Sequence, residues 1–174
     1  MEEVLRVIEK RRSCKRYKAD QTVSKELIEK IVHAGTLAAS GKGLQSPIIV
    51  AVTNREVRDR LSELNASVLG SKADPFYGAP QVLVVLADKT IGTRVYDGSL
   101  VMGNMMLAAE ALGVSSCWIH RAKEVFETPE GKEILKSAGV EGEFEGIGNL
   151  VIGYDDNGKK PCAARKDNYV YWIE

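Results

Sequence analysis

Four cationic side chains and one serine hydroxyl fall within seven residues near the start of the chain, in the run Arg-Arg-Ser-Cys-Lys-Arg-Tyr at positions 11–17. Arginine binds phosphate through two parallel hydrogen bonds, and serine adds a small donor and acceptor. The run is therefore suited to bind a small anion. Alternatively, it is a solvated basic helix end, because cations also favour the C-terminal end of a helix dipole.

The residues before this cluster predict the element that positions it. Val4, Leu5 and Ile8 recur at the three-and-four spacing of one helix face, so we expect a short amphipathic helix over residues 2–10. The cationic cluster begins where this helix ends.

The composition limits the partners of such a cluster. The 174 residues contain 24 Lys and Arg against 24 Asp and Glu, so the formal net charge is zero. Proteins that bind nucleic acids or membrane surfaces usually carry a basic excess. We therefore expect neither partner, and we expect one domain, residues 1–174, that binds a small molecule.

Cysteine usage and the start of the chain bear on the compartment. Cys14, Cys117 and Cys162 are odd in number and widely spaced, and the chain opens on an acidic rather than a basic and apolar segment. This pattern predicts free thiols in a reducing cytoplasm. The longest apolar stretch, residues 100–119, is interrupted by polar residues, so we do not expect it to span a membrane.

Hydrophobic periodicity and turn residues predict an α+β domain. Helices are expected at residues 24–37, 55–64, 97–112, 122–126 and 129–137. Strands are expected at residues 47–53, 81–87, 115–119 and 148–153.

Two segments suggest contacts beyond one subunit. Residues 97–112 are apolar on nearly every face, which is typical of a helix inside a domain or at an interface. Residues 168–173 alternate and are rich in aromatic side chains, as in an edge strand. Because this predicted strand follows a polar run, it can reach a second subunit.

Other chemistries fit the sequence less well. Cys117 and His120 are two potential metal ligands, but strand alternation would send them to opposite faces, which disfavours both a zinc site and a Cys-His hydrolase. Gly41 and Gly43 begin like a dinucleotide fingerprint, yet they follow a helix and lack the third glycine. We therefore expect no metal site.

Four segments in order resemble the nitroreductase family of FMN-dependent oxidoreductases. Residues 11–17 are similar to its Arg-x-Ser-x-Lys/Arg-x-aromatic motif, and residues 39–47 to its Ala-Pro-Ser-Gly-x-Asn-x-Gln-Pro-Trp turn. Residues 97–119 resemble the buried helix of the family and the Leu-Gly and Trp-Ile pairs that follow it. Residues 153–166 resemble the Gly-Tyr pair of the family and the Arg or Lys near the end of its sequences. Gly43 departs from the family, which often has Asn there.

The resemblance implies a fold and an activity. The fold would be a nitroreductase-like α+β domain, with a central mixed, mainly antiparallel sheet flanked by helices and a C-terminal strand that subunits can exchange. The protein would be a homodimer with FMN at the subunit interface. It would take hydride from NADH or NADPH and reduce a flat acceptor, such as a nitroaromatic, quinone or activated alkene, by a ping-pong mechanism.

The resemblance also implies which residues bind the phosphate end of FMN. Arg11, Arg12 and Ser13 would hold the phosphate and ribityl chain. Arg165, with Lys166 beside it, would complete the phosphate clamp. These roles suit the chemistry, because a dianionic phosphate favours forked cations.

The isoalloxazine ring would be held by a second group of residues. Lys15 would approach its N1 and O2 edge, where a fixed positive charge stabilises the reduced ring. Gln45 would contact the pyrimidine end of the ring. The N5 and O4 atoms of the ring would lie near backbone groups of four consecutive residues, Trp118, Ile119, His120 and Arg121. The flavin carries the redox chemistry, so no side chain is expected to be a proton-transfer catalyst.

Two alternatives remain at this stage. A relative with the same fold could catalyse another reduction, such as dehalogenation or flavin breakdown. The chain could also be a non-catalytic flavin-binding module. Bleaching of a yellow purified protein by NADH or NADPH would distinguish an enzyme from a module.

Overall fold

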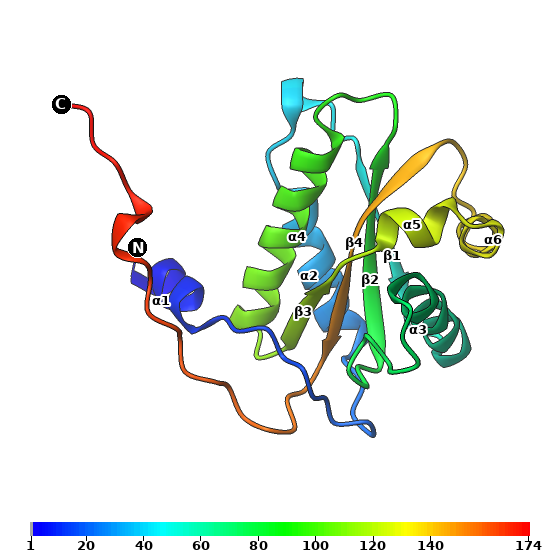
Figure 1. Cartoon of the computed structure of the whole chain (residues 1–174), viewed down its shortest axis with the longest axis horizontal. Helices are drawn as coiled ribbons and strands as arrows, with labels where there is room; N and C mark the ends of the chain where they lie inside the picture. The colour runs from blue at the N-terminus through cyan, green and yellow to red at the C-terminus, as the bar shows by residue number, and fades with distance from the viewer. Residues whose placement is uncertain (1) are drawn as a thin grey trace.

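A four-stranded antiparallel sheet forms the centre of the computed structural model, which describes residues 2–174 (Figure 1). Its strands lie in the order β1-β2-β4-β3. Their bounds are Pro47–Val52 for β1, Gln81–Asp88 for β2, Ser115–Ile119 for β3 and Phe144–Gly153 for β4. The two central strands are almost completely buried, which confirms the prediction that their apolar runs form core strands.

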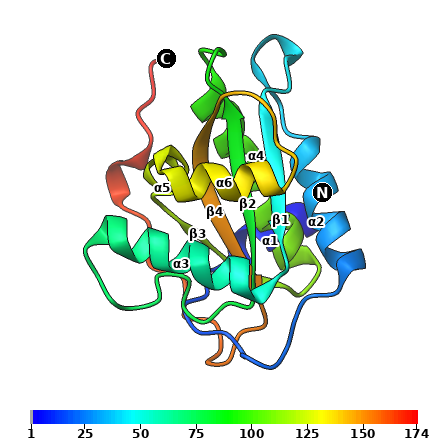
Figure 2. The same ribbon diagram turned by 90° about the vertical axis from the view of Figure 1, so that its right-hand side faces the viewer.

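Helices cover both faces of the sheet (Figures 1 and 2). Helices α2 (Lys25–Thr36) and α4 (Arg94–Ala111) pack on one face, and α3 (Arg55–Leu69), α5 (Ala122–Glu127) and α6 (Pro129–Ser137) on the other. Each face has its own hydrophobic cluster. Ile31 of α2 and Met105 of α4 belong to one, and Leu61 of α3 and Phe126 of α5 to the other.

Three elements extend by three or more residues beyond their predicted bounds, and tertiary contacts accompany each extension. Helix α3 continues past residue 64 because Asn65 and Ala66 are buried, and it ends at Gly70 in the left-handed conformation. Helix α4 begins at Arg94 rather than residue 97, and the Arg94 guanidinium donates to Glu145 of β4 at 2.8 Å. Strand β4 correspondingly begins at residue 144 rather than 148.

The C-terminal tail differs most from the prediction. Residues 168–173 do not form a strand in the single chain, where a short 3-10 helix, Asp167–Tyr169, is followed by an extended exposed segment. Figure 1 shows this segment running away from the sheet, past α1 (Glu2–Lys10). The predicted edge strand is wrong for the single chain because the tail meets no sheet edge there.

Apolar surface is left uncovered on the same side of the molecule. Val4, Leu5 and Ile8 form the predicted apolar face of α1, yet at least half of each side chain is exposed. Tyr96 and Leu100 of α4 are also exposed. Within residues 2–174, no helix is both long and apolar enough to cross a membrane.

Candidate functional site

The cationic segment at residues 11–17 lies along the outer edge of β3. Ser13 forms a parallel bridge with Ser116, and the Cys14 N–H donates to the Ser116 carbonyl at 3.0 Å. Cys14 and Tyr17 are buried in the core, whereas Ser13 and Lys15 are exposed. The segment therefore uses strand-like alternation to anchor one set of side chains and present the other.

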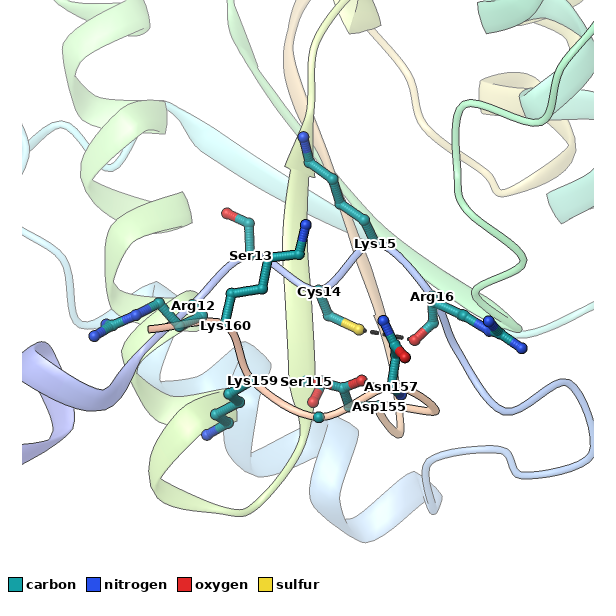
Figure 3. A pocket seen from close by; sticks show the side chains of 11 residues that line it. Arg12, Ser13, Cys14, Lys15, Arg16, Ser115, Asp155, Asn157, Lys159 and Lys160 are labelled. Atoms are coloured by element: carbon teal, nitrogen blue, oxygen red, sulfur yellow. Dashed lines mark hydrogen bonds between the residues drawn. The ribbon is translucent and has the colours of Figure 1, made fainter. Parts of the chain in front are cut away.

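A cavity of about 300 Å³ opens beside this segment (Figure 3). Residues of the C-terminal segment close its other side, and five of its lining side chains are cationic against one carboxylate. Figure 3 shows Lys15 and Lys160 pointing to the same side of this cavity. We call it the cationic pocket; it is lined by Arg12, Ser13, Cys14, Lys15, Arg16, Ser115, Asp155, Asn157, Gly158, Lys159 and Lys160.

The cations around the pocket differ in how they are paired. Lys159 pairs with Glu110, and Arg16 with Asp156 at 3.0 Å. Among the described residues, by contrast, the buried Nη1 of Arg11 and Nε of Arg12 have no hydrogen-bond partner. Buried donors are normally satisfied, so these N–H groups fit a site for an anionic ligand such as a phosphate.

The turn after β3 brings a second set of predicted residues to the sheet edge. Trp118 packs toward α4 on one face and Ile119 is buried on the other, so their side chains are committed to the core. The chain then turns at His120 and Arg121, where Arg121 adopts φ 73°. The backbone of this turn, rather than the side chains of Trp118 and Ile119, is therefore available to a ligand.

A loop before β2 presents Tyr77 to Lys15. The Lys15 Nζ lies 5.8 Å from the centre of the Tyr77 ring. Asp74 orders this loop by accepting from the Phe76 and Gly78 N–H groups and from Arg58 and Ser62. Partial burial would raise the pKa of Asp74, but these hydrogen bonds hold it below its ordinary value.

The two buried thiols act as core side chains. Burial raises the pKa of both Cys14 and Cys117, so both stay protonated at neutral pH. Cys117 is buried in β3, whereas His120 follows the end of the strand and is exposed.

Gln45 lies on a different part of the chain from the cationic pocket. It borders a separate hollow with Ser40, Pro47 and Val101. Its own N–H donates to the Ser40 hydroxyl at 3.0 Å, and it adopts φ 49°. One chain therefore does not bring Gln45 and Lys15 into the same cavity.

Asp97, in the first turn of α4, orders the turn that carries Gln45. Its carboxylate accepts from the Gly41 N–H at 2.9 Å, the Ser46 hydroxyl at 3.1 Å and the Thr93 hydroxyl at 2.9 Å. Burial would raise the pKa of Asp97, but these hydrogen bonds outweigh that effect and lower it. Asp97 is consequently ionised at neutral pH.

We expect Asp97→Asn to lower the free energy of unfolding at pH 7 by about 1–3 kcal/mol, because Asn cannot accept all three hydrogen bonds. The lowered pKa in the folded state fixes the sign of the pH dependence. The contribution of the carboxylate is fully present above its unfolded pKa of about 3.9 and is lost as the pH falls through the lower folded value.

Urea unfolding of the parent and variant across this pH range measures the difference. Asp20→Asn, at an exposed position, serves as the control and should change little. A difference that persists unchanged at the lowest pH would contradict a role for the ionised carboxylate.

Arg165 and Lys166 lie outside the cationic pocket in the single chain. The Arg165 guanidinium donates to the Ala163 carbonyl at 2.9 Å, and the Lys166 Nζ lies 5.3 Å from the centre of the Tyr169 ring. Both residues are exposed on the C-terminal tail. Lys160, which was not among the predicted site residues, borders the pocket instead. The Lys-Lys pair that follows Gly158 in the sequence was the signal that could have identified it.

The four-stranded antiparallel sheet with helices on both faces defines an α+β domain, with a cationic pocket at one sheet edge. Residues 8–154 match the model of the Nitroreductase family. Because this match covers most of the chain, the chain belongs to the nitroreductase family.

Known relatives agree with this assignment. An Archaeoglobus fulgidus protein named "Putative NADH dehydrogenase/NAD(P)H nitroreductase" is 36% identical over 124 residues, which is 68% of each chain. The crystal structure of a nitroreductase with bound FMN from Bacteroides fragilis has a TM-score of 0.89 at 25% identity and covers 99% of both chains. A nitroreductase with bound FMN from Desulfitobacterium hafniense has a TM-score of 0.87 at 26% identity, covering 99% of this chain and 100% of that one. The predicted family and the predicted nitroreductase-like α+β fold are thus confirmed, whereas exchange of a C-terminal strand between subunits stays a prediction.

Proposed function

We propose that this protein is an NAD(P)H-dependent oxidoreductase that binds FMN noncovalently. The proposal rests on two buried arginine N–H groups that have no partner among residues 2–174, one on Arg11 and one on Arg12, which lines the cationic pocket. It also rests on the similarity of the chain to nitroreductases with bound FMN. In this role the enzyme takes hydride from NADH or NADPH and passes it by a ping-pong mechanism to a flat acceptor, such as a nitroaromatic, quinone or activated alkene. Bound FMN supplies the two-electron chemistry, so the side chains need only bind, orient and set charge.

The phosphate end is assigned to the cationic segment. Arg11 and Arg12 each have a buried N–H group without a partner in the described part of the chain, and Ser13 is exposed on the pocket wall. Lys160 lines the same pocket as Arg12, and its charge adds to that of Arg12. Arg165, with Lys166 as its neighbour, can complete this clamp once the C-terminal tail is held in place.

The ring end is assigned to the carboxyl end of β3. Figure 3 shows Lys15 extending along β3 in that direction, where His120 and Arg121 form their turn. Lys15 places a positive charge where negative charge grows on reduction of the ring. The backbone of the turn offers hydrogen-bonding groups to the polar edge of the ring.

We propose a homodimer in which two subunits build each FMN site. Gln45 and Lys15 border separate cavities in one chain, and a second chain can supply Gln45 to a flavin that contacts Lys15 of the first. The exposed apolar residues of α1 and α4 provide the surface for this association. The exposed side chains on that surface are Val4, Leu5, Ile8, Val95, Tyr96 and Leu100.

We propose that the C-terminal tail of each subunit contacts the partner subunit. Strand β1 is an edge strand whose outer side has unpaired backbone groups. A hollow beside it has a largely apolar surface that includes Ile28, Val32 and Ala51, and polar side chains such as Lys25 and Glu29 also line it. The tail carries exposed Trp172 and Ile173, so pairing with an edge of the partner would cover apolar surface on both chains.

The cofactor assignment is tested by heat release. The clamp ends at one terminal phosphate, so the released cofactor is expected to run as FMN on chromatography. FAD as the main species would refute the assignment.

We expect Lys15→Met to lower the midpoint potential of bound FMN and to slow its reduction by NAD(P)H, with a smaller effect on FMN affinity. The reason is that Lys15 stabilises charge that appears only on reduction. Potentiometry and stopped-flow bleaching measure both effects. Lys18→Met, at an exposed position just beyond the pocket segment, is the control. If Lys15→Met shifts neither quantity, Lys15 does not approach the ring.

A further inference from the structure

A fully buried asparagine in α3 binds the turn that follows β3. Asn65 has 0% of its surface exposed, and an amide in the core is costly unless both of its polar atoms are bonded. Its Nδ2 donates to the His120 carbonyl at 2.8 Å, and its Oδ1 accepts from the Arg121 Nε at 3.0 Å. Both bonds of this amide are therefore made to two consecutive residues at the candidate ring site.

The residue that Asn65 holds has a strained backbone. Arg121 adopts φ 73° and ψ 14°, the left-handed region that costs a non-glycine residue about 1 kcal/mol or more. Such a conformation persists only where its surroundings enforce it. Asn65 supplies this enforcement from both sides, through the carbonyl before Arg121 and through the Arg121 side chain.

The turn is positioned where it can shape a ligand site. It directly follows β3, whose outer edge carries the cationic segment through the Ser13–Ser116 bridge. It also starts α5, because the Arg121 carbonyl accepts from the Val125 N–H at 3.0 Å. A change in the Arg121 backbone would thus alter the groups that β3 presents at its carboxyl end.

We infer that Asn65 is a positioning residue for the flavin ring: it holds the His120–Arg121 backbone in the left-handed turn that the ring site requires, without touching the ring. The inference rests on the proposed FMN function. It assigns control of FMN affinity and potential to a residue of α3 that no sequence motif identifies.

The test uses the freedom of glycine in the left-handed region. Asn65→Ala removes both hydrogen bonds and should weaken FMN binding about tenfold and shift the midpoint potential. Arg121→Gly, added to Asn65→Ala, makes the left-handed conformation inexpensive and should restore much of the affinity and potential. Arg121→Ala, added instead, removes the same side chain but keeps the backbone cost, so it should not restore them.

The single variant Asn65→Asp separates the two hydrogen bonds. Asp can still accept from the Arg121 guanidinium, but it cannot donate to the His120 carbonyl when ionised. An intermediate loss of affinity is expected if both bonds hold the turn. Circular dichroism of each variant verifies that the domain is folded.

Amide hydrogen exchange of the FMN-free protein provides a readout that does not depend on the cofactor. Asn65→Ala should speed exchange in residues 119–123, and Arg121→Gly should slow it again relative to Arg121→Ala. If exchange follows this pattern but the parent protein does not bind FMN, the proposed function is refuted, and the role of Asn65 in holding the turn is still supported. Parent-like FMN affinity and potential in Asn65→Ala, or equal rescue by glycine and alanine, would overturn the inference.

Discussion

Removal of residues 161–174 is expected to yield a folded monomer that binds FMN at least about a hundredfold more weakly than the parent. The truncation deletes Arg165 and Lys166, and a charge-assisted hydrogen bond contributes roughly 1.5–3 kcal/mol, or about ten- to a hundredfold in affinity. It also deletes the exposed tail that we assign to the partner subunit. These residues are exposed in the single chain, so their loss should leave its core intact.

Sedimentation and FMN titration measure the two effects. The double variant Trp172→Ser, Ile173→Ser serves as the matched control, because it keeps Arg165 and Lys166 while removing apolar side chains of the tail. This double variant should dimerise more weakly than the parent. At protein concentrations high enough to restore the dimer, it should lose less FMN affinity than the truncated chain. A truncated chain that stays dimeric, or that binds FMN normally as a monomer, would contradict the assignment of the tail.

Arg11→Ala is expected to weaken FMN binding by about ten- to a hundredfold, since it removes a guanidinium whose Nη1 is buried without a partner among the described residues. The proposed contact is with the phosphate, remote from the ring. Once saturated with FMN, the variant should therefore be reduced at close to the parent rate.

Titration of the FMN-free protein and stopped-flow reduction at saturating FMN separate binding from reduction. Lys10→Ala, one position earlier at the end of α1, is the control and should bind FMN normally. Unchanged affinity in Arg11→Ala would place the phosphate elsewhere. A slow reduction that FMN saturation does not correct would instead place Arg11 near the ring.

Local sequence pattern predicted the core better than it predicted element ends. The continuous apolar run in β2 has few alternatives to a buried strand, and the structure confirms it. The sequence predicted a helix that ends at residue 64, one residue before Asn65. Asn65 lies within α3 because its amide is satisfied by His120 and Arg121, more than fifty residues later in the chain.

The candidate site shows the same limit. The cationic segment was visible because its residues are adjacent in sequence, whereas the role of Asp97 depends on a turn 51 to 56 residues earlier. The aromatic alternation of residues 168–173 satisfied the strand pattern, yet a strand also needs a neighbouring strand. A single chain does not provide one for the tail, and its sequence alone could not show this.

Anaerobic titration of the purified protein with NADH and NADPH tests the central claim most directly. Bound flavin, identified as FMN after heat release, should be bleached stoichiometrically by at least one nucleotide, and its colour should return on addition of a nitroaromatic or a quinone. A protein that binds no flavin, or whose bound flavin neither nucleotide bleaches, would contradict the assignment as an NAD(P)H-dependent flavin oxidoreductase.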